Sequence, residues 1–298
     1  MNISKYIQKF LLIITCLIFS SNKNFSQTLD LSTAELTIVA EGFQFVEGPL
    51  WKDGSLLFSD IPANKIYKFT PDSETKIFLE PSGNSNGLSF DKNGNLVLAQ
   101  HGERRIARLE NDGSQTVLAS HYECKKLNSP NDIAVKSDGA IFFTDPPYGI
   151  SKEQEELGYY GIYRISPAGF VQLLDKTLRR PNGIVFSPDE KKLYVNDCEA
   201  KIIYVWDVVS DTAIANKKQF AVINIDGYGV DGMKVDSKGN LYSTGPKGLW
   251  VFAPDGTLLK MIEVPGQTTN CNWGGEDKNT LFITSGDTIY GLSSSQKD

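Results

Sequence analysis

The stretch 129-SPNDIAVKSDGAIFFTD-145 decides the fold, because it has the pattern of two short strands joined by a tight turn. Apolar and small residues alternate after Asn131-Asp132, Ser137-Asp138-Gly139 supplies turn-forming residues, and Ile141–Asp145 forms the returning strand. The unit begins with an amide and an acid. Related units occur before and after it, and each begins with an acid or an amide.

Six such hairpins follow one another along the chain. We call the acid or amide at the start of each hairpin its head residue; the six are Glu47, Asn86, Asn131, Asn182, Asp231 and Asn270. Successive head residues are separated by 39, 45, 51, 49 and 39 residues. Sheet units at this period predict an all-β protein, a six-bladed β-propeller, rather than a solenoid.

The head residues are candidates for a metal site. The innermost strand of each propeller blade lines a central channel, so the six side chains should lie at one height around its axis. Carboxylate and amide oxygens are the ligands that calcium, magnesium and manganese prefer. The alternative is that each Asn or Asp only shapes the entry into its strand. Glu47 and Asp231 would repel each other if unpaired, which favours the cation.

The N-terminal segment 1–26 is predicted to be a signal peptide. Lys5 and Lys9 precede the apolar run Phe10–Ser20, which is too short to span a bilayer. Cleavage near Ser26 would leave residues 27–298 as one secreted or periplasmic propeller domain; lipidation at Cys16 is the alternative. Loss of the segment's three lysines would change the net charge from −6 to −9.

Composition excludes several classes of partner and site. An acidic chain argues against binding to nucleic acid and to anionic membranes, and we expect no membrane insertion of the mature chain. We expect a monomer or a weak oligomer. Three cysteines remain after residue 26, so no complete disulfide framework is expected. Two isolated histidines, His101 and His121, cannot build a His-rich zinc site.

The chain ends and one long loop complete the predicted architecture. A strand around Leu36–Ala40 is expected to complete the last blade, because closing the ring removes free edges. Further strands are predicted at 65–69, 105–109, 162–165, 202–206 and 249–252. The longest connection within a blade, Asp145–Gly161, either covers a site or is a solvated excursion.

Several motifs resemble one known family. Glu47-Gly48-Pro49, Ser129–Asp132, Arg180–Gly183 and Val230–Met233 are similar to motifs of the gluconolactonase, senescence marker protein and luciferin-regenerating enzyme family. Segments 100–105, 144–149 and 270–275 resemble its bacterial gluconolactonase branch. The resemblance covers nearly the whole chain after residue 26.

The resemblance implies one divalent metal ion in the channel, with Ca²⁺ expected first and Zn²⁺, Mn²⁺ or Mg²⁺ as alternatives. It implies Glu47, Asn182 and Asp231 as metal ligands, and Asn131 as a further ligand or a substrate contact. Asp231 is also the implied general base. Animal members carry an arginine where this chain has Ser129, so their sugar contacts do not transfer; His101 is a candidate substitute.

These features predict an exported, metal-dependent sugar lactone hydrolase whose substrate is a small lactone. Asp231 and His101 are the candidate catalytic residues, with His101 either protonating the ring oxygen or only binding substrate. The candidate substrate-binding residues are Asn131, His101, Tyr148, Asn86 and Asn270. A phosphotriesterase-like hydrolase, or a non-catalytic propeller that binds a sugar or a partner around a structural metal, are the alternatives. We expect no catalytic Cys–His arrangement, which argues against a covalent cysteine route.

Overall fold

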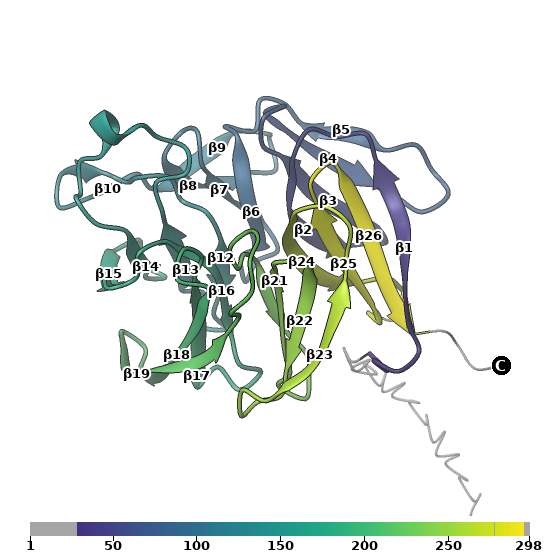
Figure 1. Cartoon of the computed structure of the whole chain (residues 1–298). Helices are drawn as coiled ribbons and strands as arrows, with labels where there is room; N and C mark the ends of the chain where they lie inside the picture. The colour runs from purple at the N-terminus through teal and green to yellow at the C-terminus, as the bar shows by residue number, and fades with distance from the viewer. Residues whose placement is uncertain (1–28, 277, 295–298) are drawn as a thin grey trace, which may run out of the picture.

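The computed structural model describes residues 29–276 and 278–294, and these form six four-stranded antiparallel sheets arranged in a ring (Figure 1). The predicted six-bladed β-propeller is therefore confirmed. The first three blades comprise β2 (Val46–Lys52), β3 (Ser55–Asp60), β4 (Lys65–Phe69) and β5 (Lys76–Leu79); β6 (Ser85–Phe90), β7 (Leu96–Gln100), β8 (Arg105–Leu109) and β9 (Gln115–Ala119); and β12 (Ile133–Val135), β13 (Ile141–Asp145), β14 (Gly161–Ile165) and β15 (Val171–Asp175).

The remaining blades continue the same order from the channel outward. They comprise β16 (Pro181–Phe186), β17 (Lys192–Asp197), β18 (Ile202–Ser210) and β19 (Ala213–Val222); β20 (Met233–Val235), β21 (Leu241–Gly245), β22 (Gly248–Phe252) and β23 (Leu258–Glu263); and β24 (Thr268–Gly274), β25 (Thr280–Ser285), β26 (Thr288–Ser294) and β1 (Ala34–Glu41). The strands predicted near 65–69, 105–109, 162–165, 202–206 and 249–252 are the third strands of their blades.

The last blade joins the two ends of the described chain. β1 pairs antiparallel with β26, from Ala34 opposite Ser294 to Glu41 opposite Thr288. In Figure 1 the purple strand lies beside the yellow one. The closing strand predicted at Leu36–Ala40 is confirmed, and it is longer at both ends.

Burial falls from the inner strands to the outer ones. Every residue of β3, β7 and β13 is buried, whereas most of β5 is exposed. The core consists of apolar clusters between neighbouring blades, such as the one that contains Phe143 stacked on Tyr163. A core made between blades fixes each inner strand relative to the next, which gives the channel a rigid wall.

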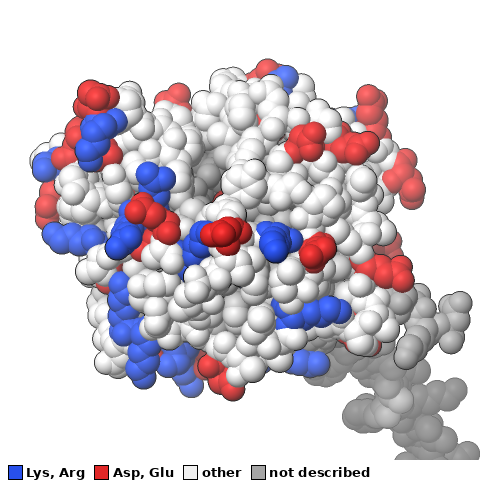
Figure 2. All heavy atoms as spheres, viewed as in Figure 1, with Lys and Arg blue, Asp and Glu red and all other residues white. Residues whose placement is uncertain are grey.

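Two features lie outside the regular blades. The connection after β13 contains one turn of 3₁₀ helix, η1 (Lys152–Gln154), and precedes β14. A small hairpin of β10 (His121–Tyr122) and β11 (Lys125–Lys126), which the sequence pattern did not predict, lies between the second and third blades. Figure 2 shows acidic and basic side chains interspersed over one face of the molecule.

The predicted signal peptide and the lipidation alternative at Cys16 lie outside the described residues. Within the part of the chain that the structure describes, no helix has the length and apolar character needed to cross a membrane.

Candidate active site in the central channel

All six head residues lie at the channel end of an innermost strand. Four lie within β2, β6, β16 and β24, and Asn131 and Asp231 come two residues before β12 and β20. Five are at most 3% exposed, and Asp231 is half-buried with its Oδ1 closed off from solvent. The predicted ring of oxygen-bearing side chains is therefore present at the level of strand position.

Hydrogen bonds between blades position the head residues. Near the end of a second strand, Ser59 Oγ donates to the Asn86 carbonyl oxygen (2.8 Å) and Thr144 Oγ1 donates to that of Asn182 (2.7 Å). Asn196 Nδ2 donates in the same way to the Asp231 carbonyl oxygen. We call these contacts the inter-blade clasps. Each holds the backbone of a head residue, which leaves its side chain free to face the channel.

Glycine after a head residue permits this close approach. A Cβ on Gly48 would lie 2.3 Å from the Asn86 carbonyl oxygen, and a Cβ on Gly183 would lie 2.3 Å from that of Asp231. Gly87 and Gly232 are similarly crowded. The third and sixth blades carry Asp132 and Cys271 at this position instead, so the third blade brings an additional carboxylate to the channel.

A second set of acids has a structural role. Asp60, Asp145 and Asp197 each end a second strand and accept backbone N–H bonds from the segment that leads into the innermost strand of the same blade. Burial raises the pKa of Asp145 to about 7. Its carboxylate nevertheless accepts bonds from the N–H groups of Asn128 (2.8 Å) and Ser129 (2.7 Å). This perturbed acid therefore holds a loop and is not a catalytic candidate.

Three carboxylates act on one another in the channel. Burial, followed by the charge of Asp132, raises the pKa of Glu47 to about 7. Burial, then Glu47 and then Asp132 raise the pKa of Asp231 well above its usual range. Burial likewise raises the pKa of Asp132, and the nearby Lys234 partly offsets this. The channel therefore carries an excess of negative charge that a bound cation would relieve.

Unpaired oxygens in the same region fit a cation. Asn86 Oδ1, Asn182 Oδ1 and Asp231 Oδ1 are buried without a hydrogen-bond partner, although a buried polar atom ordinarily has one. Among the described residues, no group of three or more His, Cys, Asp or Glu is arranged to hold a metal. The candidate cation ligands among the head residues differ from such a group, because they include Asn amide oxygens as well as carboxylate oxygens. Hard divalent cations accept such a set.

The remaining candidates differ in what they can contact. Asn270 Nδ2 donates to Glu47 Oε2 (3.0 Å), while Asn270 Oδ1 accepts the Cys271 N–H (2.9 Å). Asn270 is thus engaged in orienting Glu47. Asn131 is buried and its carbonyl oxygen accepts the Gly87 N–H (2.8 Å), which ties it to the second blade.

His101 lies beneath the long loop rather than among the carboxylates. A Cβ on Gly149 would lie 2.5 Å from His101 Nε2, and the Gly149 N–H donates to Ser129 Oγ (2.9 Å). Burial lowers the pKa of His101 to about 4, so its imidazole is neutral at pH 7. A neutral ring suits hydrogen bonding to a substrate better than it suits proton donation. Ser129, where animal members of the resembled family carry arginine, holds the loop.

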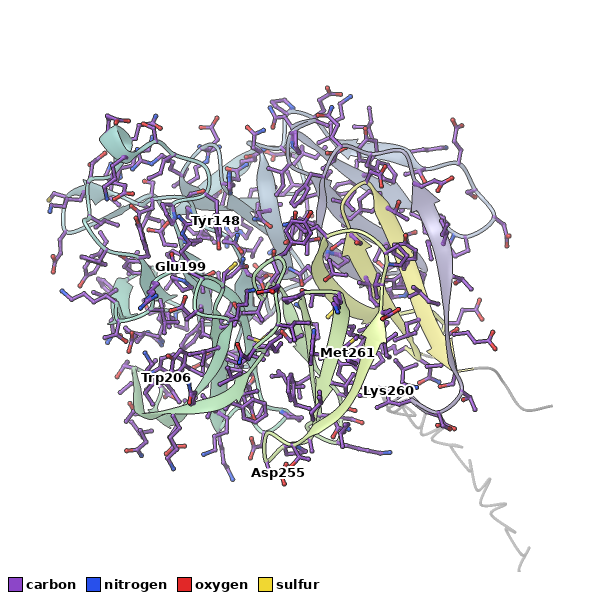
Figure 3. All side chains as sticks on the ribbon, viewed as in Figure 1. Tyr148, Glu199, Trp206, Asp255, Lys260 and Met261 are labelled. Atoms are coloured by element: carbon purple, nitrogen blue, oxygen red, sulfur yellow. The ribbon has the colours of Figure 1, made fainter. Side chains whose placement is uncertain are left out.

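The loop places Tyr148 at the cation candidates. Its hydroxyl is shut off from solvent, and the side chains of Cys198 and Asn182 lie near it without reaching hydrogen-bond geometry. The charge of Asp231 also acts on it. The Arg180 guanidinium lies 5.8 Å from the Tyr148 ring centre. Figure 3 labels Tyr148 nearer the middle of the molecule than Trp206 or Asp255. The loop Asp145–Gly161 therefore covers the site at Tyr148. Only its outer part around η1 extends into solvent.

Sequence reasoning missed Asp132, Lys234 and Cys198. Asp132 had a signal, because it stands where four of the six units have glycine. Lys234 and Cys198 had none. They lie close to the site only through the packing of β20 and of the turn after β17.

Comparisons with known proteins show similarity over most of the chain. The family model described as SMP-30/Gluconolactonase/LRE-like region matches residues 45–287. The gluconolactonase of Zymomonas mobilis is 39% identical over 287 residues, covering 86% of this chain and 80% of that enzyme.

Solved structures match as well. A gluconolactonase from Xanthomonas campestris matches with a TM-score of 0.81 at 35% identity, covering 88% of this chain and 90% of that one. The calcium-binding protein regucalcin from Agrobacterium tumefaciens matches with a TM-score of 0.73, covering 87% of this chain and 95% of that one. Its identity is 20%, so this likeness supports the fold alone.

Proposed function

Because this chain belongs to the SMP-30/gluconolactonase/LRE-like family, we propose that it is an exported, metal-dependent hydrolase of sugar lactones. The matched gluconolactonases support the coarse activity, hydrolysis of a cyclic carboxylic ester. Metal dependence and the residue roles rest on the channel. The observation that carries them is the coincidence of unpaired buried oxygens with carboxylates that raise one another's pKa.

Glu47, Asn182 and Asp231 are the proposed ligands, with Asn131 beside them as a further ligand or a substrate contact. When bound, a divalent cation would polarise the ester carbonyl and offset negative charge that develops on its oxygen. Amide ligands contribute no charge, so this set leaves the site more positive than a cage of carboxylates would. The clasp on the Asn182 carbonyl holds the backbone of this ligand in place.

Asp231 is the proposed general base. Its Oδ1 is buried and has no protein partner, so it is available to a water molecule. It takes one proton from that water as the oxygen attacks the lactone carbonyl carbon. Only the charged carboxylate can accept this proton, and a cation bound beside Asp231 would favour that form over the protonated one.

The lactone itself would occupy the mouth of the channel. Asn131, Asn86 and the neutral imidazole of His101 are proposed to hydrogen-bond the sugar hydroxyls, and Tyr148 covers the site from the loop. Asn270 is proposed to act through Glu47, whose carboxylate it holds.

A panel of aldono-1,5- and 1,4-lactones tests the proposal. The protein is assayed as purified, after removal of metal by a chelator, and after addition of Ca²⁺, Zn²⁺, Mn²⁺ or Mg²⁺. We expect turnover to be lost on chelation and restored by at least one of these cations. Binding of a sugar without turnover of any lactone would favour the non-catalytic alternative.

A further inference from the structure

Tyr148 is the buried hydroxyl that the proposed reaction leaves unused. Its phenolic oxygen is closed off from solvent and lacks a hydrogen-bond partner. The groups around it are those of the site: the side chains of Cys198 and Asn182 lie near it without reaching hydrogen-bond geometry, and the charge of Asp231 acts on it. A buried hydroxyl without a partner costs free energy, so its position at the reacting groups calls for a ligand that completes it.

Contacts of Gly149 and of Arg180 position Tyr148. Gly149, the next residue, packs against the His101 ring with no room for a Cβ, because a Cβ there would lie 2.4 Å from His101 Cδ2. The Gly149 N–H also donates to Ser129 Oγ (2.9 Å). On the other side the Arg180 guanidinium faces the phenol ring, and Arg180 Nε lies 3.4 Å from Glu199 Oε2. Tyr148 and Glu199 are both labelled in Figure 3.

A lactone has two oxygens that gain negative charge during hydrolysis. In the proposed function, the carbonyl oxygen is stabilised by the cation that the head residues would hold, and Asp231 takes the proton from the water. The ring oxygen gains charge when its bond to the acyl carbon breaks, and none of these groups is assigned to it. His101 is a poor proton donor because it is neutral, and Arg180 is engaged by Glu199.

We propose that the Tyr148 hydroxyl donates a hydrogen bond to the lactone ring oxygen and stabilises it as the leaving group. This inference rests on the proposed lactone hydrolysis. Water loses one proton to Asp231 and its oxygen bonds to the carbonyl carbon. The bond from that carbon to the ring oxygen then breaks, and its electron pair stays on the ring oxygen. That oxygen receives the proton that Asp231 took up, which yields the hydroxy acid; Tyr148 keeps its own proton throughout.

Replacement of the hydroxyl tests the proposal. Tyr148→Phe removes only the donor, and we expect kcat for a sugar lactone to fall about 10²-fold, the scale for one donor to developing charge, with KM changed little. The matched control is Tyr160→Phe in the same loop, whose hydroxyl donates to Glu155 (2.8 Å) away from the channel. This control should retain wild-type kcat.

The leaving group distinguishes this role from simple positioning. Dihydrocoumarin is an aryl lactone whose phenol leaves with a pKa of about 10, so it needs the donor far less than an alkyl alcohol does. We expect the loss in Tyr148→Phe to be at least tenfold smaller on dihydrocoumarin than on a sugar lactone. Calorimetric affinity for the activating cation should match the wild type.

The remaining outcomes distinguish failure of the Tyr148 role from failure of the proposed function. Equal losses on both lactones, a change confined to KM, or no loss would overturn the role of Tyr148. If the wild type opens only the sugar lactone, a kcat loss of 30-fold or more at unchanged KM supports the proposal, and a smaller one overturns it. A wild type that opens neither lactone in the presence of cation would overturn the proposed function instead.

Discussion

At the residue scale, burial pushes the two candidate catalytic residues toward different protonation states. It raises the pKa of Asp231, where Glu47 and Asp132 add to the effect, and lowers that of His101. Both shifts have one cause, because low-dielectric surroundings favour the neutral form of the Asp231 carboxyl and the neutral form of the His101 imidazole. Cation binding and base function both require the charged form of Asp231, so a bound cation must offset the effect of burial on this acid.

His101 has a consequence for stability that is independent of metal. Its pKa is about 4 in the folded protein and about 6.5 in an unfolded chain, so the unfolded state binds more protons between these values. Stability should therefore fall as the pH falls from 6.5 to 4, by up to about 3 kcal/mol from this residue. Urea unfolding of the wild type and of His101→Gln, at several pH values in chelator, measures the difference.

His121→Gln is the matched control, because His121 is exposed. We expect His101→Gln to be less sensitive to acid than the wild type and His121→Gln to behave like the wild type. Parallel pH profiles for all three proteins would show that His101 is not held neutral by burial.

Site residues that recur at the same position of each hairpin unit could be predicted from the sequence, and residues outside this repeat mostly could not. Six head residues in register marked the channel, and those strand positions are as expected. Asp132 broke the glycine pattern and could have been found from it. Tyr148 was expected at the site as a substrate contact, whereas Lys234 and Cys198 depend on how β20 and the turn after β17 pack, which no local pattern encodes.

At the element scale, the inter-blade clasps connect the fold with the site. Thr144 Oγ1 donates to the Asn182 carbonyl oxygen and accepts the Asp132 N–H (3.2 Å), so one hydroxyl ties three strand segments together. The sequence showed a Ser, Thr or Asn near the end of several second strands but gave no sign of which backbone each would contact. That pairing depends on the packing of neighbouring blades.

Thr144→Val keeps the shape of the side chain and removes these bonds. We expect a loss of about 1–3 kcal/mol in the free energy of unfolding, since it leaves a buried carbonyl and a buried N–H unsatisfied. We also expect weaker cation binding, because Asn182 loses its clasp. Urea unfolding and calorimetry measure the two effects, with Thr116→Val on the exposed side of β9 as the control. Reduced stability with unchanged cation affinity would contradict a positioning role for the clasp.

At the scale of the whole molecule, the hairpin period predicted six blades and the pairing of the chain ends, and both are confirmed. The outermost strands were the least visible in the sequence. β5 and β23 are largely exposed, so solvent rather than packing selects their residues and no strong alternation results. The β10–β11 hairpin was not predicted because strands of two residues each are too short to show a periodic pattern.

Export concerns the segment before the propeller and is a separate prediction. Lys5, Lys9 and the apolar run Phe10–Ser20 should direct secretion, followed by cleavage near Ser26. Mass spectrometry of the protein from its native host should find a mature chain that begins near Gln27. A cytoplasmic chain that retains Met1 would refute export, and a lipid on Cys16 would indicate a lipoprotein instead.

The central claim is that the channel holds a cation for catalysis and that Asp231 serves both cation and water. The most direct measurement is lactone turnover by Asp231→Asn in samples whose cation occupancy is determined in parallel. The substitution keeps an oxygen ligand of similar shape and removes the charge and the basicity. We predict that the variant still binds the cation, more weakly, while kcat at full occupancy falls by about 10²–10⁴-fold. An Asp231→Asn variant that turns over the lactone as fast as the wild type at full cation occupancy would contradict the account. So would a wild-type protein whose turnover is unchanged by chelation.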